Sequence, residues 1–293
     1  MALTILELAR ISLTSANADA LAAFYENGLG FVQTARDKVD ATLYGMPGSA
    51  ALVVTLALGE QLIELVQFDQ PGAAYPAATT SHDPWFQHLA IVVTDINAAL
   101  LRLNQHTAPV VISQQGPVTL PAASGGVTAI KLRDPELHPF ELLQFPAGSV
   151  PSSWSNLEPP QGSFALGIDH SAIVVSDIVA STSFYTGLGL MATSATLNQG
   201  AEQDLLDATS GAVVNVAGFS PPQATPHVEL LCYSTPAGPA ARSVAVNDIA
   251  ATRMVMRAEG LLKAEEGLML DPDGHRLLLV GTRGWEDPAS NPT

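Results

Sequence analysis

The stretch FYENGLGF at Phe24–Phe31 returns in a shortened form as FYTGLGL at Phe184–Leu190. Each copy ends a helix-forming run, and its glycines can adopt the left-handed conformation that terminates a helix. Each run begins directly after a small polar residue, Asn17 or Asp177, whose side chain can accept the free N–H groups of the first turn. A helix that recurs with both of its ends indicates that the chain is built from internal repeats.

Four strand-to-helix openings extend the repeat along the chain. Each joins an apolar, mostly β-branched run to a capping residue, and the four are ISLTSAN at 11–17, IVVTDIN at 91–97, IVVSDIV at 173–179 and VAVNDIA at 244–250. They predict helices at 18–27, 96–105, 178–186 and 249–259. Each unit then closes on a strand, and the four are QLIELVQF at 61–68, PFELLQF at 139–145, HVELLCY at 227–233 and HRLLLVG at 275–281.

Two of these closing strands follow similar turns, DPELH at 134–138 and DPDGH at 271–275. Proline presets φ in such turns, so both segments predict a reversal of the chain. We interpret His138 and His275, which end the turns, as structural residues. The segment 146–165, rich in proline, glycine and serine, predicts a linker between two halves.

The expected halves are residues 1–145, with modules at 1–70 and 85–145, and residues 166–283, with modules at 166–235 and 238–283. Residues 284–293 have no periodicity and are expected to form a flexible tail.

The composition excludes several classes of protein. Twelve basic and 28 acidic residues give a formal net charge of −16, which argues against nucleic acid and anionic membranes as partners. The single cysteine, Cys232, excludes an internal disulfide. The first ten residues lack the basic start of a secretory signal, and no apolar run approaches the roughly 20 residues of a membrane span. We therefore expect a soluble, cytoplasmic protein.

With these helix endings, turns and closing strands, the chain resembles the vicinal oxygen chelate superfamily over residues 4–282. This superfamily includes glyoxalase I, methylmalonyl-CoA epimerase, extradiol dioxygenases and bleomycin-binding proteins. The resemblance implies an α+β fold in which four βαβββ modules pair into two curved, half-open β-barrels. It also implies that metal ligands come from the first and last strands of the modules.

The repeat allows the ligand positions to be compared module by module. The position seven residues before each helix cap holds Arg10, His88, His170 and Ala241, and the acidic position of each last strand holds Glu64, Glu141, Glu229 and Leu278. Only the second and third modules keep both a histidine and a glutamate. We expect His88, Glu141, His170 and Glu229 to hold one divalent ion. Zn, Ni, Mn, Co and Fe all suit this mixed nitrogen and oxygen set.

The pairing of the modules decides whether these four residues meet. If modules pair in sequence order, one cavity holds Arg10, Glu64, His88 and Glu141, and the other keeps only one histidine and one glutamate. If the second module pairs with the third, all four expected ligands share a cavity, and we favour this arrangement. Arg10 would then oppose a metal in the other cavity and could pair with Glu64. Tyr233 shares a strand face with Glu229, so it either lines the pocket or packs in the core.

The favoured function is a metal-dependent enzyme of the glyoxalase or epimerase type, a lyase or isomerase. It would transfer a proton on a small, oxygen-chelating substrate through an enediolate, with Glu141 or Glu229 as the base. The scarcity of basic residues favours a neutral substrate. Two alternatives remain open: an extradiol-type dioxygenase, which Ala241 and Leu278 argue against, and a non-catalytic binding or resistance protein.

Overall fold

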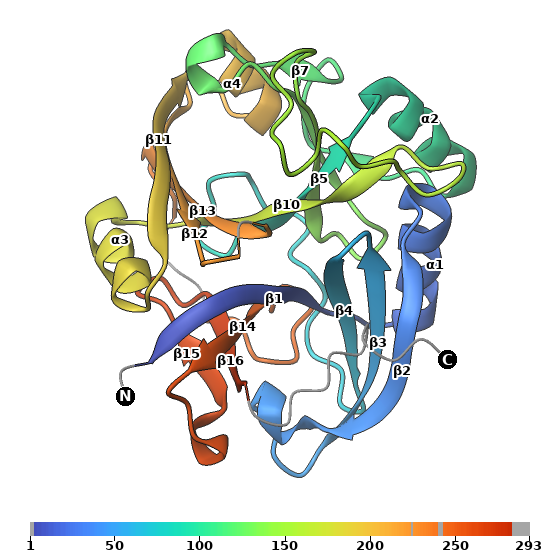
Figure 1. The fold of residues 1–293 in the computed structure, drawn as a ribbon, viewed down its shortest axis with the longest axis vertical. Coiled ribbons are helices and arrows are strands. Elements are labelled where there is room, and N and C mark those ends of the chain that lie inside the picture. Colours follow the sequence, from blue (N-terminus) through green and yellow to red (C-terminus); the bar gives the residue numbers. More distant parts are fainter. Residues whose placement is uncertain (1–2, 224, 240–242, 283–293) are drawn as a thin grey trace.

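The computed structural model describes residues 3–223, 225–239 and 243–282, which form two strongly curved sheets, one above the other in Figure 1. Each sheet combines one module from the first half of the chain with one from the second half. The seven-stranded sheet has the order β15-β16-β14-β1-β4-β3-β2. The nine-stranded sheet has the order β11-β12-β13-β10-β5-β9-β8-β6, and its ninth strand, β7, also pairs with β8. The first module therefore pairs with the fourth and the second with the third, as in the favoured arrangement.

The first two modules follow the expected order of strand, helix and strands. The first consists of β1 (Thr4–Thr14), α1 (Ala18–Leu29), β2 (Val32–Asp40), the 3-10 turn η1 (Ala41–Tyr44), β3 (Ala50–Leu58) and β4 (Gln61–Phe68). The second consists of β5 (Gln87–Val93), α2 (Ile96–His106), β6 (Val110–Val111), β7 (Val118–Thr119), η2 (Ala122–Ser124), β8 (Thr128–Arg133) and β9 (Pro139–Gln144).

The third module contains an extra helix, and the fourth is shorter. The third consists of β10 (Ala165–Val174), α3 (Ile178–Gly187), β11 (Met191–Gln199), α4 (Ala201–Asp207), β12 (Val213–Ser220) and β13 (His227–Thr235). The fourth consists of β14 (Arg253–Glu259), η3 (Lys263–Glu265), β15 (Gly267–Leu270) and β16 (Arg276–Gly281). None of the helices in the described ranges is long and apolar enough to cross a membrane.

The helix signals are confirmed in the first three modules. The side chains of Asn17, Asp95 and Asp177 each accept a hydrogen bond from a backbone N–H in the first turn of the following helix. Gly30 ends α1 with φ of 81°, a left-handed conformation that glycine adopts without a steric penalty.

The helix predicted at 249–259 is wrong, because residues 253–259 form the central strand β14. Asp248 does not cap a helix. Its carboxylate instead accepts hydrogen bonds from the backbone N–H groups of Ala73 and Ala245. The strand-to-helix opening expected at 244–250 is likewise absent, and these residues form a loop with turns. Pairing with β1 on one side and β16 on the other satisfies the backbone of β14, and this outweighs the local helix signal. Ala241 and residues 284–293 lie outside the described residues.

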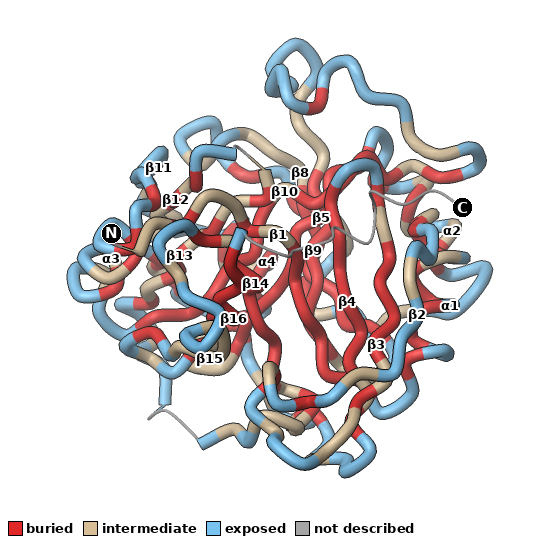
Figure 2. The backbone as a smooth tube through the Cα atoms, turned by 60° about the horizontal axis from the view of Figure 1, so that its bottom comes forward, coloured by how far each residue is buried: buried red, intermediate tan, exposed pale blue. Residues whose placement is uncertain are grey.

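The two largest apolar cores connect modules within each half of the chain, whereas the sheets connect modules from different halves. One core joins the first two modules, where α1 lies against α2, and a second joins the third and fourth modules. Figure 2 shows these buried strands at the centre of the molecule, with exposed loops around them. Each module is thus held by one partner through its sheet and by another through its core.

Candidate metal centre

Two histidines lie next to each other on one face of the nine-stranded sheet, on its two central strands. His88 lies in β5 and His170 in β10, which run antiparallel with His88 opposite Ala172 and His170 opposite Ala90. The two histidines are therefore diagonal neighbours on one face of the sheet. Their ring centroids are 5.8 Å apart, and both residues are buried.

Two glutamates from the flanking strands complete the group. In β9, which is parallel to β5, Glu141 lies opposite Ala90; in β13, which is parallel to β10, Glu229 lies opposite Ala172. Oε2 of Glu141 is 3.3 Å from Nε2 of His88, and Oε2 of Glu229 is 3.5 Å from Nε2 of His170. The structure thus brings together the four residues expected to bind a metal, and all four line one cavity of about 360 Å³.

The state of His88 fits a metal ligand. Neither of its ring nitrogens has a partner with hydrogen-bond geometry, although both are buried. Burial lowers the pKa of His88 despite the nearby Glu141, so the imidazole is neutral, the form that coordinates a cation. A buried polar atom without a partner is costly, and a divalent ion between the two histidine–glutamate pairs would satisfy it.

His170 and Glu229 form a strongly coupled pair. Burial opposes protonation of His170, but the Glu229 charge and a hydrogen bond to Asp169 outweigh it and raise the pKa of His170 to about 9. Burial likewise opposes ionisation of Glu229, but the charges of His170 and His227 lower the pKa of Glu229 to about 2. The carboxylate is therefore ionised at neutral pH, as a metal ligand must be.

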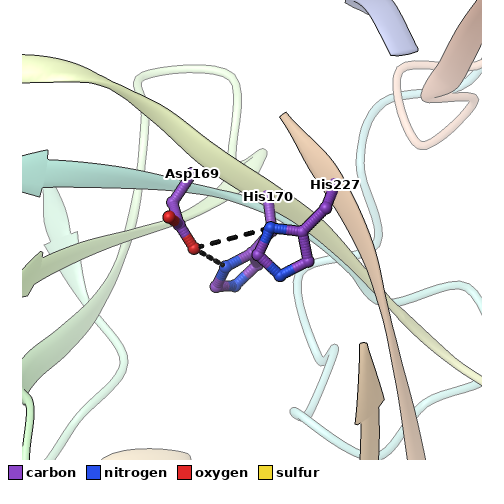
Figure 3. Close-up of side chains that lie close together, drawn as sticks. All are labelled: Asp169, His170 and His227. Atoms are coloured by element: carbon purple, nitrogen blue, oxygen red, sulfur yellow. Dashed lines mark hydrogen bonds and ion pairs between the residues drawn. The ribbon is translucent and has the colours of Figure 1, made fainter. Parts of the chain in front are cut away.

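Asp169 and His227 both lie beside His170, and Figure 3 shows the three side chains together. Oδ2 of Asp169 lies 2.9 Å from Nδ1 of His170 and 3.8 Å from Nδ1 of His227. Each of the three offers a ligand atom, and these atoms lie within 4.8 Å of one another, so this trio is a second candidate metal set. We favour the four-residue set, because the Nδ1 of His170 is already hydrogen-bonded to Asp169 and its Nε2 faces Glu229.

A second buried network borders the cavity, centred on Asp207 at the end of α4. Its carboxylate accepts hydrogen bonds from Lys131 at 2.5 Å, Gln203 at 2.6 Å and the hydroxyl of Tyr233 at 2.8 Å. Tyr233 therefore lines the cavity with its ring, and its hydroxyl is tied to α4. The charge of Lys131 is balanced by Asp207, which leaves the cavity with an excess of carboxylates.

In the seven-stranded sheet, the positions equivalent to the four candidate ligands hold different residue types. The register of β1 and β14 puts Arg253 where β5 has His88, so the earlier assignment of Ala241 to that position is wrong. Leu278, opposite Val255, occupies the Glu141 position. Nε of Arg10 lies 2.5 Å from Oε2 of Glu64, which confirms the expected ion pair.

The guanidinium of Arg253 lies over the rings of Tyr44 and Phe68, which are part of the core that fills this side of the sheet. Arg10 and Arg253 outnumber Glu64, so these positions carry a net positive charge that repels a divalent cation.

The sequence analysis missed Asp169, Lys131 and Asp207. Strand alternation puts Asp169 on the face opposite His170, but a break in the register between Ile168 and His170 bulges the strand and turns Asp169 toward the site. Lys131 lies opposite Glu141 in the β8–β9 pair, and this placement can be predicted only when the register of the two strands is known. Asp207 arrives on α4, which no repeat signal marks.

The family model described as the Glyoxalase/Bleomycin resistance protein/Dioxygenase superfamily matches residues 7–142. Glyoxalase I from Zea mays shares the fold with a TM-score of 0.58 and 13% identity, covering 96% of this chain and 92% of its own. A candidate dioxygenase from Bacillus subtilis matches with a TM-score of 0.53 and 10% identity, covering 96% and 86%. No curated protein sequence matches. Residues 7–142 thus match a glyoxalase/bleomycin resistance protein/dioxygenase superfamily domain, and at this identity the solved structures establish the fold alone.

Proposed function

We propose that the protein is a metal-dependent enzyme of the glyoxalase or epimerase type, which moves a proton on a small substrate with two adjacent oxygens. The observation that carries this proposal is the meeting of two imidazoles and two carboxylates at one wall of a single cavity. A divalent ion in such a site supplies Lewis-acid chemistry, polarising substrate oxygens so that a neighbouring C–H bond becomes more acidic.

Glu229 is the residue best placed to take the proton. Its side chain is 23% exposed to the cavity, whereas that of Glu141 is 10% exposed and lies in the strand beside Lys131. A general base must reach the substrate carbon as well as hold a suitable charge, and the more exposed carboxylate meets the first requirement. Glu141 then serves as the fixed partner of His88.

The cavity favours a neutral and largely apolar substrate. Its size falls within the range of roughly 300–1,000 Å³ that accommodates small organic ligands. Leucine, valine and phenylalanine side chains supply much of its wall, for example Leu120, Leu143, Phe145 and Val216. Glu141, Asp169 and Glu229 repel an anion, and Lys131, the one lysine or arginine that the described residues place in the wall, is paired with Asp207.

The first test is metal content. Elemental analysis of purified protein should find one divalent ion per chain, and the ion should be lost in His88→Ala and His170→Ala. His106→Ala is the matched control, because this histidine lies exposed at the end of α2. Protein that carries no ion and takes none up at micromolar supply would refute a metal-dependent enzyme and leave a non-catalytic binding protein.

The second test is proton exchange. Neutral α-hydroxyketones incubated with the protein in deuterated water should take up deuterium at the carbon next to the carbonyl, measured by NMR. Glu229→Gln should lose this exchange and keep its metal. If Glu229→Gln and Glu141→Gln both exchange at the wild-type rate, neither glutamate is the base.

A dioxygenase is the second candidate. Two histidines and one carboxylate are the ligand set of many oxygenases that use Fe(II), and His88, His170 and either glutamate provide it. Oxygen uptake in the presence of Fe(II) and catechols, without deuterium incorporation, would favour this candidate over proton transfer.

A further inference from the structure

The segment between β9 and β10 places a tryptophan against the metal centre. Trp154 is 2% exposed and packs in the core that also contains Ala90, Leu143 and Leu166. Its indole Nε1 donates a hydrogen bond to Oδ1 of Asp169 at 3.0 Å. A side chain on Gly167 would approach the indole ring to 2.7 Å, so the absence of one gives the ring its room. The linker is therefore tied to the strand that carries His170.

The other oxygen of Asp169 fixes the orientation of His170. Oδ2 lies 2.9 Å from Nδ1 of the imidazole, and because a carboxylate only accepts hydrogen bonds, Nδ1 is the nitrogen that donates. Nε2 is then the nitrogen that faces Glu229. With one oxygen held by Trp154 and the other by His170, the carboxylate has little freedom to rotate.

We propose that Trp154 is a positioning residue for the metal centre. It holds Asp169, and Asp169 holds His170 with Nε2 facing Glu229, where the imidazole would be available to bind an ion. This inference rests on the proposed metal-dependent function and adds that the segment joining the second and third modules is part of the site. Groups that orient a metal-binding histidine typically change metal affinity by 10- to 100-fold when they are removed.

The test is the Co(II) affinity of variants, measured by titration with a competing chelator. Asp169→Asn keeps the shape of the side chain and removes its charge, and it should bind Co(II) roughly 10- to 100-fold more weakly. Trp154→Phe keeps the aromatic packing and removes the N–H donor, and it should lose affinity in the same direction by a smaller factor. The shape of the Co(II) absorption spectrum should stay the same in both, because the ligands are unchanged.

The double variant shows whether the two residues act in series. If Trp154 acts through Asp169, then Trp154→Phe with Asp169→Asn should bind Co(II) as weakly as Asp169→Asn alone. Trp85→Phe is the matched control, because the Trp85 indole donates to Thr79 rather than to Asp169, and its Co(II) affinity should equal that of the wild type. Circular dichroism of the metal-free variants verifies that they are folded.

Three results would overturn the inference alone. These are unchanged Co(II) affinity in both single variants, losses that multiply in the double variant, or a changed Co(II) spectrum in Asp169→Asn, which would make Asp169 a ligand together with His227. Wild-type protein that binds no Co(II), or that binds it equally well after His88→Ala and His170→Ala, would overturn the proposed function and this inference together.

Discussion

The hydroxyl of Tyr25 donates a hydrogen bond to Oδ2 of Asp134 at 3.0 Å and so joins helix α1 of the first module to the β8–β9 turn of the second. The hydroxyl of Tyr185 makes the same bond to Asp271 at 3.1 Å, from the third module to the fourth. This hydrogen bond connects two of the repeated sequence motifs. The Phe-Tyr helix endings occur in the first and third modules, and the Asp-Pro turns that receive the tyrosines occur in the second and fourth.

Removal of this hydroxyl should destabilise the fold. Tyr25→Phe leaves a buried carboxylate with one partner fewer, which costs about 1–3 kcal/mol. Urea denaturation should show this loss in the free energy of unfolding, and Tyr185→Phe should show a similar one. Wild-type stability in both variants would mean that the two motifs are not linked energetically.

His138 should make stability depend on pH. Its Nδ1 lies 2.9 Å from the Asp134 carboxylate, and its Nε2 lies within 3.1 Å of the carbonyl oxygens of Thr14 and Ile249. Both nitrogens thus face acceptors, which favours the protonated ring. Burial opposes this charge, but Asp134 and Glu136 outweigh it and raise the pKa of His138. These contacts confirm that His138 has a structural role, since it bridges the two sheets.

A histidine whose pKa is raised by folding stabilises the protein fully below its unfolded pKa of about 6.5. The stabilisation is lost as the pH rises through the folded pKa. The difference in unfolding free energy between wild type and His138→Gln should therefore be larger at pH 6 than at pH 9. A difference that does not vary with pH would show that the ring is neutral in the folded protein.

Metal should stabilise the folded protein, because the ligands converge only when the second and third modules are paired. An ion present at about 1,000 times its Kd adds about 4 kcal/mol to the free energy of unfolding. The melting temperature should rise when Zn(II) or Ni(II) is added to chelator-treated protein and should stay unchanged in His88→Ala. His106→Ala should respond as the wild type does, and an equal shift in His88→Ala would place the ion elsewhere.

The ion pair in the other sheet should be sensitive to the loss of its acid. Burial lowers the pKa of Arg253 to about 10 even though Glu64 opposes the shift, so two buried guanidinium groups depend on this one carboxylate. Breaking a buried pair costs about 3–5 kcal/mol. Glu64→Gln should therefore destabilise the protein by this amount, and more than Arg10→Met does, as measured by urea denaturation.

Metal content provides the control for this variant. It should remain that of the wild type, because Glu64 lies in the other sheet from His88 and Glu141. Loss of the ion in a folded Glu64→Gln protein would contradict the division of roles between the two sheets.

The sequence by itself determined the features that depend on neighbouring residues. Helix caps such as Asn17 and Asp95 satisfy N–H groups two or three residues away, and a strand such as Gln61–Phe68 is recognised by its own side chains. The repetition of these local signals predicted the modules, and the family resemblance that they carry implied the fold class and the four residues that meet in the cavity. It failed in the fourth module, where a cap-like Asp248 precedes a strand.

The tertiary structure decided which modules pair and what completes the site. The backbone N–H and C=O groups of a strand can pair with any strand that lies beside it. Residues 253–259 form strand β14 because β1 and β16 lie on either side of them. The register of those pairs assigned Arg253 to a ligand position, and a bulge turned Asp169 toward His170. Trp154 and Asp207 contact residues of the cavity wall from segments that no repeat marks. Contacts between such distant segments depend on packing in three dimensions rather than on spacing along the chain.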